Sequence, residues 1–240
     1  MRAHFEAPSG QPANHVALSP LSFLKRAEKV YADRPATTCG EVTRTWGEVG
    51  TRCRAVAAAL ALRGVSLGDT VAVLAANGPE LFELHYAVPL LGAVLNAINS
   101  RLDAESVAYI LDHSDAVMVI VDPALSTLLN DAFTHLGRTL PVLDLEDYET
   151  LTAHAPMAWA LPADEGQALA LNYSSGPSGK PKGVIYHHRG AYLMAMGTVA
   201  GWALPPNPTY LSVVPMFHCN GWNHPWAMAV VGGHMIFVRE

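Results

Sequence analysis

The chain has 240 residues and a formal net charge of −6; half of its residues are hydrophobic and 15% are charged. This length and composition suit one large domain or two small ones with a substantial core, and they exclude an intrinsically disordered chain. Because the charge balance is acidic and no basic stripe alternates with aromatic residues, we predict no nucleic-acid partner.

The sequence also bears on the cellular compartment. The three cysteines, Cys39, Cys53 and Cys219, are odd in number and lack C-x-x-C spacing, so a disulfide framework is not expected. The first six residues contain no apolar run typical of a secretory signal, and no uncharged apolar run reaches the length of a membrane span. We therefore predict a cytoplasmic protein without a membrane span.

The first half of the chain alternates between helical and strand patterns. Helices are predicted over 46–63, from Pro79 onward, and over 103–112 with Asp103 as the cap. Strands are predicted over 70–75, 94–98 and 117–121. These strands are apolar throughout rather than alternating, which is typical of a parallel sheet flanked by helices, and the predicted fold class is therefore α/β.

The stretch 122–166 is predicted to be less regular, with a strand end at Val142-Leu143 and a connecting segment that forms a sub-boundary near 155–167. Further strands are predicted at 169–173, 184–187 and 210–214, and helices at 189–203 and 222–231. A last strand runs from His234 to the final residue. Because a domain rarely ends inside an apolar strand, we expect the front part of a longer protein; the alternative is a genuine C-terminal strand.

One loop carries most of the functional information. Residues 173–183 read Y-S-S-G-P-S-G-K-P-K-G and contain two of the four lysines, Lys180 and Lys182. Glycines let backbone N–H groups approach an anion, hydroxyls add hydrogen-bond donors, and lysines add positive charge. This composition predicts a site for a polyphosphate.

The distribution of charge favours the same interpretation. Residues 1–165 hold 20 acidic and 11 basic residues, whereas 166–240 hold one acid, Glu240, and four basic residues. A region that receives a phosphorylated ligand excludes carboxylates, because like charges repel strongly when buried. The alternative is that these apolar core segments simply avoid charge.

The spacing within the loop excludes two common phosphate motifs. A Walker A loop counted from Gly176 fails because Pro181 stands where glycine is required, and no G-x-G-x-x-G occurs. The loop instead resembles the signature [ST]-[ST]-G-[ST]-[ST]-G-x-P-K-G of the AMP-binding, acyl-adenylate-forming superfamily. Eight of its nine specified positions match: Ser174, Ser175, Gly176, Ser178, Gly179, Pro181, Lys182 and Gly183.

The ninth position is Pro177, which lacks both a hydroxyl and a backbone N–H. If that N–H normally faces the phosphates, its loss weakens ATP binding by about 1–2 kcal/mol. If it faces away, the proline only stiffens the loop. The residues leave both readings open.

Three other segments carry the same resemblance. Residues 215–222 read P-M-F-H-C-N-G-W and resemble the aromatic/His motif of ligases for short- to medium-chain and thioether carboxylates, including 3-methylmercaptopropionyl-CoA ligases. Thr45–Glu48 and Asn99–Leu102 resemble the T-[YW]-x-E and N-x-R-L segments of such enzymes. A metal site at His218, Cys219 and His224 is disfavoured because no further ligand cluster is evident.

The resemblance implies the N-terminal part of the large adenylation domain of acyl-CoA synthetases, without its C-terminal part and lid. It implies a carboxylic acid–CoA ligase that uses ATP, Mg²⁺ and coenzyme A. The residues implied for the nucleotide are Ser174, Ser175, Gly176, Pro177, Ser178, Gly179, Lys182 and His218, with Ser174 near the metal. Those implied for the acid are Phe217, His218, Asn220 and Trp222.

No catalytic residue is assigned, because the family's later motifs, including its C-terminal lysine, lie beyond position 240. We therefore expect the 240 residues alone to be inactive. The alternative is a non-catalytic half-domain or pseudoenzyme that binds a phosphorylated ligand. The implied partner is a small-molecule carboxylate, and no oligomeric state is assigned.

Overall fold

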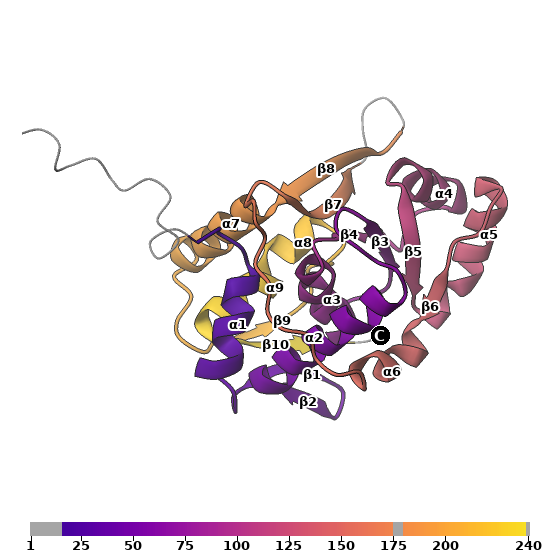
Figure 1. Ribbon diagram of the computed structural model, residues 1–240. Coiled ribbons are helices and arrows are strands. Elements are labelled where there is room, and N and C mark those ends of the chain that lie inside the picture. Colours follow the sequence, from indigo (N-terminus) through magenta and orange to yellow (C-terminus); the bar gives the residue numbers. More distant parts are fainter. Residues whose placement is uncertain (1–15, 175–179, 239–240) are drawn as a thin grey trace, which may run out of the picture.

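The computed structural model describes residues 16–174 and 180–238, which form two β-sheets with helices between and outside them (Figure 1). The larger sheet has the strand order β6-β5-β3-β4-β7-β8. All neighbouring strands are parallel except β7 and β8, which form an antiparallel hairpin. In chain order these strands are β3 (Thr70–Leu74), β4 (Val94–Ala97), β5 (Ala116–Val121), β6 (Val142–Asp144), β7 (Ala168–Ser174) and β8 (Lys182–His187).

The smaller sheet joins the two ends of the described chain. Its order is β2-β1-β10-β9, with β1 and β2 antiparallel and the other pairs parallel. Thr37 of β1 lies opposite Met235 of β10, so this sheet closes the fold through contacts of very long sequence separation. The strands are β1 (Pro35–Cys39), β2 (Val42–Thr45), β9 (Thr209–Leu211) and β10 (His234–Phe237).

The helices divide into two groups. Two of them cover one face of the larger sheet and share a core with it: α4 (Ala104–His113) and α5 (Ser126–Leu136). The second core lies between the two sheets and takes side chains from both of them. The helices on this side are α1 (Leu21–Val30), α2 (Trp46–Leu62), α3 (Pro79–Leu90), α6 (Tyr148–Thr152), α7 (His188–Gly201), α8 (Cys219–Trp222) and α9 (His224–Val231).

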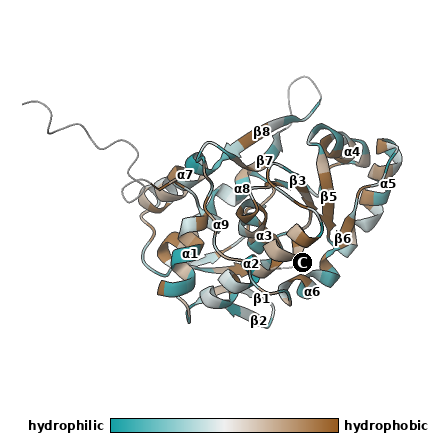
Figure 2. Ribbon diagram, viewed as in Figure 1, coloured by the Kyte–Doolittle hydropathy of each residue, from teal (hydrophilic) through white to brown (hydrophobic). Residues whose placement is uncertain are grey.

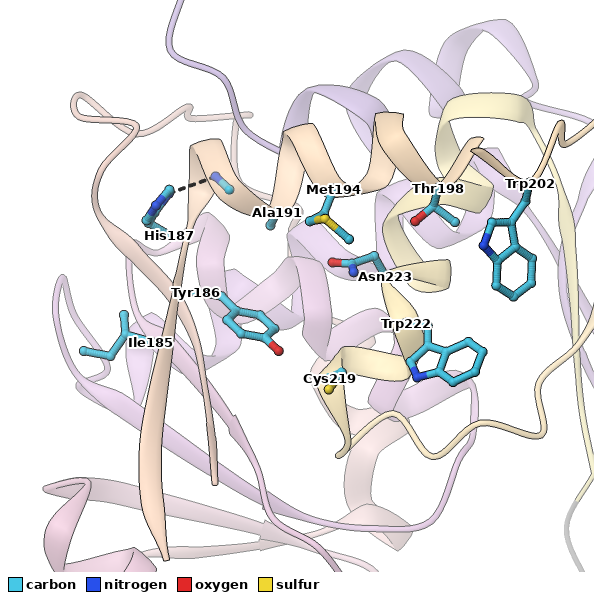
Figure 3. Close-up of a pocket in the computed structure, with 11 residues that line it drawn as sticks. Ile185, Tyr186, His187, Ala191, Met194, Thr198, Trp202, Cys219, Trp222 and Asn223 are labelled. Carbon is cyan, nitrogen blue, oxygen red and sulfur yellow. Dashed lines mark hydrogen bonds between the residues drawn. The ribbon is translucent and has the colours of Figure 1, made fainter. Parts of the chain in front are cut away.

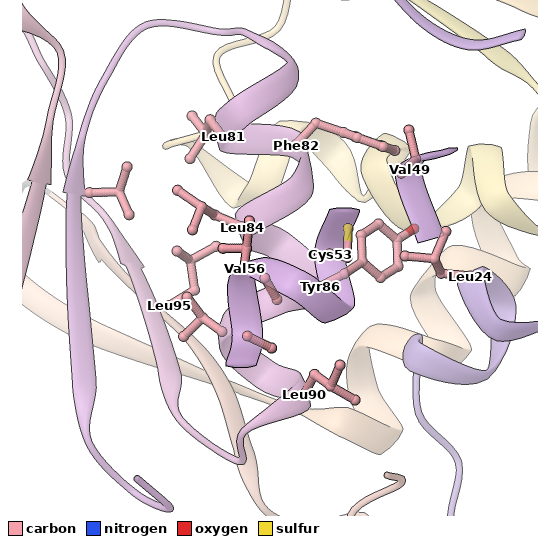
Figure 4. Close-up of a cluster of buried hydrophobic side chains, with 14 of the residues drawn as sticks. Leu24, Val49, Cys53, Val56, Leu81, Phe82, Leu84, Tyr86, Leu90 and Leu95 are labelled. Carbon is pink, nitrogen blue, oxygen red and sulfur yellow. The ribbon is translucent and has the colours of Figure 1, made fainter. Parts of the chain in front are cut away.

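Helix α3 is the centre of the molecule. Its residues are buried along almost its whole length, and Figure 4 shows Phe82 and Tyr86 among the side chains of α1 and α2. The hydrophobic colour of Figure 2 is likewise strong along β5 in the larger sheet. Each buried side chain of this size contributes about 2 kcal/mol to the free energy of folding. In the described part of the chain, no helix is long and apolar enough to cross a membrane.

The predicted α/β class is confirmed, and the alternation of helices and strands over 46–121 is found nearly as expected. The prediction for 122–166 was wrong in part, because this stretch contains α5, whose Leu129, Ala132 and Phe133 face the larger sheet and whose end is capped by Gly137 at φ 71°. Residues 155–167 contain no helix or strand, and the sub-boundary there stays a prediction.

Several later elements are shorter than predicted. Strand β9 ends at Leu211 instead of Val214, and the side chain of Asn77 bonds to the backbone carbonyls of Ser212 and Val214 that follow it. Helix α7 ends at Gly201 instead of residue 203, and α9 begins at His224 instead of Trp222 because the residues before it have positive φ angles. The last predicted strand is observed as β10 but ends at Phe237, and residues 239–240 lie outside the described residues.

Candidate functional site

The hairpin β7–β8 carries the predicted phosphate loop at its tip. Ser174 and Lys182 lie directly opposite each other in the register of the two strands, and both are exposed. The hairpin therefore brings a hydroxyl and an ammonium group to the same end. The predicted residues Ser175, Gly176, Pro177, Ser178 and Gly179 lie outside the described residues.

The two lysines of the loop segment have different surroundings. The Nζ atom of Lys180 lies 5.5 Å from the ring centre of Tyr109 on α4, which is a cation–π distance. Nearby, the hydroxyl of Tyr173 and Nδ1 of His113 share a hydrogen bond of 2.8 Å. Lys180 is thus directed to an aromatic surface, whereas Lys182 has an exposed side chain on the strand itself. This difference favours Lys182 as the cation for a ligand.

A cavity of about 510 Å³ lies between β8, α7 and the turn that follows residue 218 (Figure 3). Most of its wall at α7 is a stripe at helical spacing, formed by Ala191, Met194 and Thr198 and continued by Trp202 directly after the helix. None of the described lining residues is acidic. The described lining residues are Ile185, Tyr186, His187, Gly190, Ala191, Met194, Thr198, Trp202, Cys219, Trp222 and Asn223.

One end of the cavity is bordered by aromatic rings. The rings of Trp202 and Trp222 meet edge to face with centres 6.0 Å apart, and Trp202 meets His224 in the same way at 4.9 Å. His224 in turn stacks on Tyr210 at 4.0 Å, and its own side chain is buried. Such aromatic contacts stabilise the arrangement of these rings at the edge of the cavity.

Few polar groups reach the cavity. Burial, aided by the neighbouring Cys219, raises the pKa of Tyr186 to about 12, so its phenol stays protonated at neutral pH. His187 caps the start of α7, and its Nδ1 accepts a hydrogen bond of 2.8 Å from the Gly190 N–H (Figure 3). A mostly apolar cavity with a few polar groups suits the body of a weakly polar organic group.

The turn beside the cavity has an unusual backbone. Cys219, Asn220, Gly221, Trp222 and Asn223 have φ angles of 46°, 42°, 57°, 55° and 62°. A left-handed conformation costs residues with a Cβ about 1–2 kcal/mol each, although asparagine tolerates it better than most. Backbone strain of this kind persists only where surrounding contacts hold it, and it is frequent at functional sites.

The predicted acid-site residues occupy different positions. Trp222 lines the cavity and is half exposed, whereas Phe217 is half-buried against the main core. His218 is exposed, with Nε2 4.0 Å from the Cys219 sulfur. Asn220 is fully buried and bonded to Asn172 and His85, so in this geometry its amide has no free surface for a substrate.

Most of the cavity wall was not predicted from the sequence. The missed residues include Tyr186 and the stripe on α7, whose i, i+3, i+4 spacing was the available signal. That signal is weak because α7 is apolar on several sides, so no single face stands out. Among the residues that the structure describes, no cluster of three or more His, Cys, Asp or Glu could hold a metal ion.

Comparison with known proteins gives consistent matches. A family model described as AMP-binding enzyme matches residues 24–240. An acetate/butyrate–CoA ligase of Arabidopsis thaliana, named as peroxisomal, is 39% identical and aligns with 95% of this chain. A 2-methylpropanoate–CoA ligase of Humulus lupulus is 36% identical and aligns with 96% of it. The chain spans 45% of the length of each of these two ligases.

A solved structure agrees in fold. A fatty acyl CoA synthetase of Mycobacterium tuberculosis superposes on 91% of this chain with a TM-score of 0.82, at 26% identity. The match covers 44% of that chain. The fold expected from the loop signature, that of the N-terminal part of such synthetases, is therefore confirmed.

Proposed function

The chain belongs to the family of AMP-binding enzymes, and from this premise we propose that it is part of an ATP-dependent carboxylic acid–CoA ligase. A carboxylate oxygen attacks the α-phosphorus of ATP, and the bond to pyrophosphate breaks, which gives an acyl-adenylate. The thiol of coenzyme A then attacks the acyl carbon, and AMP leaves. The thiol proton passes to solvent, and the product is acyl-CoA.

The cavity beside α7 is the proposed site for the body of the acid. The observation that carries this proposal is its position: β8 leads from Lys182 at the loop to Ile185, Tyr186 and His187 in the cavity wall. One strand thus connects the phosphate loop to an apolar pocket. The lining has no carboxylate, so an anionic substrate meets no like charge there.

Ser174 and Lys182 are the described residues that fit the phosphates. Their side chains face each other across the hairpin end, and an ammonium with a hydroxyl can neutralise and orient a phosphate oxygen. Mg²⁺ in such enzymes screens the triphosphate charge and orients the leaving group. The described residues offer Mg²⁺ no carboxylate cluster, so we propose that the phosphates and the Ser174 hydroxyl hold it.

The cavity is large enough for small to medium apolar acids. A volume of about 510 Å³, bordered at one end by Trp202 and Trp222, accommodates short-chain, branched, thioether or single-ring acids. The two plant relatives are named for acetate, butyrate and 2-methylpropanoate. A cytoplasmic location stays a prediction, because the Arabidopsis relative is named as peroxisomal.

The test is a panel of acids assayed by pyrophosphate release on the protein at its natural length, with ATP, Mg²⁺ and coenzyme A. The panel runs from acetate to decanoate and includes methylmercaptopropionate and benzoate. We expect turnover of acids that fit the cavity and little turnover of decanoate. The Lys182→Met variant is expected to lose about 10- to 100-fold in kcat/KM for ATP, the loss typical of a charge-assisted hydrogen bond.

Lys29→Met is the matched control, because Lys29 is an exposed lysine on α1, away from the hairpin. It is expected to retain the parent kinetics. Pyrophosphate release with none of the acids would contradict the ligase proposal. ATP binding without any such release would favour the non-catalytic alternative, a module that only binds a phosphorylated ligand.

A further inference from the structure

Three buried polar side chains form a line from the centre of the molecule to the cavity wall. Nε2 of His85, on α3, lies 2.9 Å from Nδ2 of Asn220. Oδ1 of Asn220 lies 2.6 Å from Nδ2 of Asn172, on β7. His85 and Asn220 are fully buried and Asn172 is nearly so. Buried polar groups that are paired in this way fix the elements that carry them.

The direction of each hydrogen bond follows from one carbonyl. Nδ1 of His85 lies 2.7 Å from the carbonyl oxygen of Leu81, which can only accept, so Nδ1 carries the proton. Nε2 of the neutral ring is then an acceptor and takes its bond from the Asn220 amide N–H. Asn220 Oδ1 accepts in turn from Asn172. Burial lowers the pKa of His85 to about 4, so the ring stays neutral.

This line of side chains ends in the left-handed turn 219–223. Inside the turn the backbone bonds are local, such as Gly221 N–H to His218 C=O at 2.9 Å. Local bonds of this kind do not orient the turn relative to the rest of the molecule. The Asn220 side chain does, because it reaches both α3 and β7. The flanking residues Cys219 and Trp222 line the cavity.

We propose that His85 is a positioning residue for the cavity. By accepting a hydrogen bond from Asn220, it holds the turn 219–223 in the form that directs Cys219 and Trp222 to the cavity. The inference rests on the proposed function only in taking the cavity as the site of the acid.

Two variants remove the bond from opposite ends. His85→Phe keeps a ring of similar shape but offers no acceptor. Asn220→Gly tolerates positive φ and has no side-chain N–H to donate. His85→Gln is the conservative control, because its amide oxygen can accept from Asn220. The double variant, His85→Phe with Asn220→Gly, is expected to be no worse than either single variant.

The primary readout is the reactivity of the Cys219 thiol, which needs no enzyme activity. In a Cys39→Ser background Cys219 is the accessible thiol, because Cys53 is fully buried. We expect His85→Phe and Asn220→Gly to react with a disulfide reagent about tenfold faster than the parent, the factor that 1.4 kcal/mol produces. His85→Gln is expected to restore the parent rate.

The second readout is selectivity in the intact enzyme. A loosened Trp222 enlarges the cavity, so the ratio of kcat/KM for butyrate to that for decanoate is expected to fall about tenfold in both variants. The KM for ATP is expected to stay within about twofold of the parent value. A purely structural role would lower the unfolding temperature and leave this ratio unchanged.

A folded His85→Phe variant with the parent thiol rate and the parent selectivity would overturn the proposal. If that variant does not fold, Asn220→Gly decides by the same two measurements. If no acid is turned over at all, the thiol rates still test the role of His85, and only the proposed ligase function fails. Unchanged thiol rates in an active enzyme would refute the positioning role alone.

Discussion

At the scale of single residues, Asn77 shows how one side chain shapes the region around the cavity. Its amide N–H groups donate to the carbonyls of Ser212 and Val214 and to the Ser212 hydroxyl, at 3.2, 2.8 and 3.3 Å. Its oxygen accepts from the N–H of Met216 at 2.8 Å. Asn77 therefore holds this stretch through its side chain, and it fixes the start of the segment that leads to the turn 219–223.

We predict that Asn77→Ala lowers the free energy of unfolding by about 2 kcal/mol, because it leaves the Met216 N–H and the Val214 carbonyl without partners. Urea unfolding followed by circular dichroism measures this loss. Asn130→Ala is the matched control, since Asn130 is exposed on α5, and it is expected to be neutral or slightly stabilising. Equal stability of the Asn77→Ala variant and the parent would contradict the assigned role.

At the scale of elements, helix α2 begins with a capping box. The Thr45 hydroxyl accepts from the Glu48 N–H at 3.3 Å, and the Glu48 carboxylate accepts from the Thr45 N–H at 2.7 Å. These bonds lower the pKa of Glu48, chiefly through the Thr45 backbone. The segment Thr45–Glu48 resembles a family motif, and its residue types are explained locally because they provide hydrogen-bond acceptors for free N–H groups at the helix start.

Replacing the cap residue Thr45 should lower the free energy of unfolding without changing the cavity or the phosphate loop. Thr45→Ala is expected to lower the free energy of unfolding by about 1 kcal/mol. Thr45→Ser keeps the oxygen and should remain within about 0.5 kcal/mol of the parent. Both values can be taken from thermal or urea unfolding. Similar losses in the two variants would show that the methyl group, rather than the cap, supports α2.

The elements that the sequence predicts well are those with strong local signals. Asp103 caps α4 as predicted, and Gly64 and Pro79 mark a helix end and a helix start. The pairing of β1 with β10 has no local signal, because the two strands are about 200 residues apart in sequence and meet only when the core forms. The left-handed turn before α9 likewise has only weak local signals, since Asn220, Gly221 and Asn223 tolerate positive φ but do not require it.

At the scale of the whole molecule, the site is predictable only in part. The loop signature leads directly to Ser174 and Lys182, which the register brings together. The cavity depends on packing between α7 and the turn 219–223, and the buried state of Asn220 depends on α3, far away in sequence. The spacing of residues within a motif predicts neither the cavity nor the burial of Asn220, because both depend on contacts between elements far apart in sequence.

Buried histidines give the whole fold a dependence on pH. Burial lowers the pKa of His85 and of His188 to about 4, against an ordinary value of 6.5. His188 is enclosed at the start of α7, where Nδ1 and the Ser19 hydroxyl share a bond of 2.8 Å. Burial also lowers the pKa of His224 and His234. Between about pH 6.5 and 4 the unfolded chain binds protons that the folded chain does not.

The direction of the pH effect on stability follows from the difference in pKa between the folded and the unfolded chain. For His85 and His188, the stability of the folded form with a neutral ring is fully present above about pH 6.5 and is lost as the pH falls to about 4. Each of these two groups changes the free energy of unfolding by up to about 1.4 kcal/mol per pH unit in that window. We therefore predict that stability, measured by urea unfolding at a series of pH values from 7 to 5, decreases steadily with acid.

One variant isolates a single group from the rest. His188→Gln retains a polar partner for Ser19 but cannot titrate, so its stability curve should fall less steeply by about 1 kcal/mol per pH unit. All other titrating groups contribute equally to both proteins, and the difference between the curves therefore reports His188 alone. Parallel curves from pH 7 to 5 would mean that the folded protein protonates His188 as readily as the unfolded chain does. The helix start of α7, and with it one wall of the cavity, would then be more open to water than this packing allows.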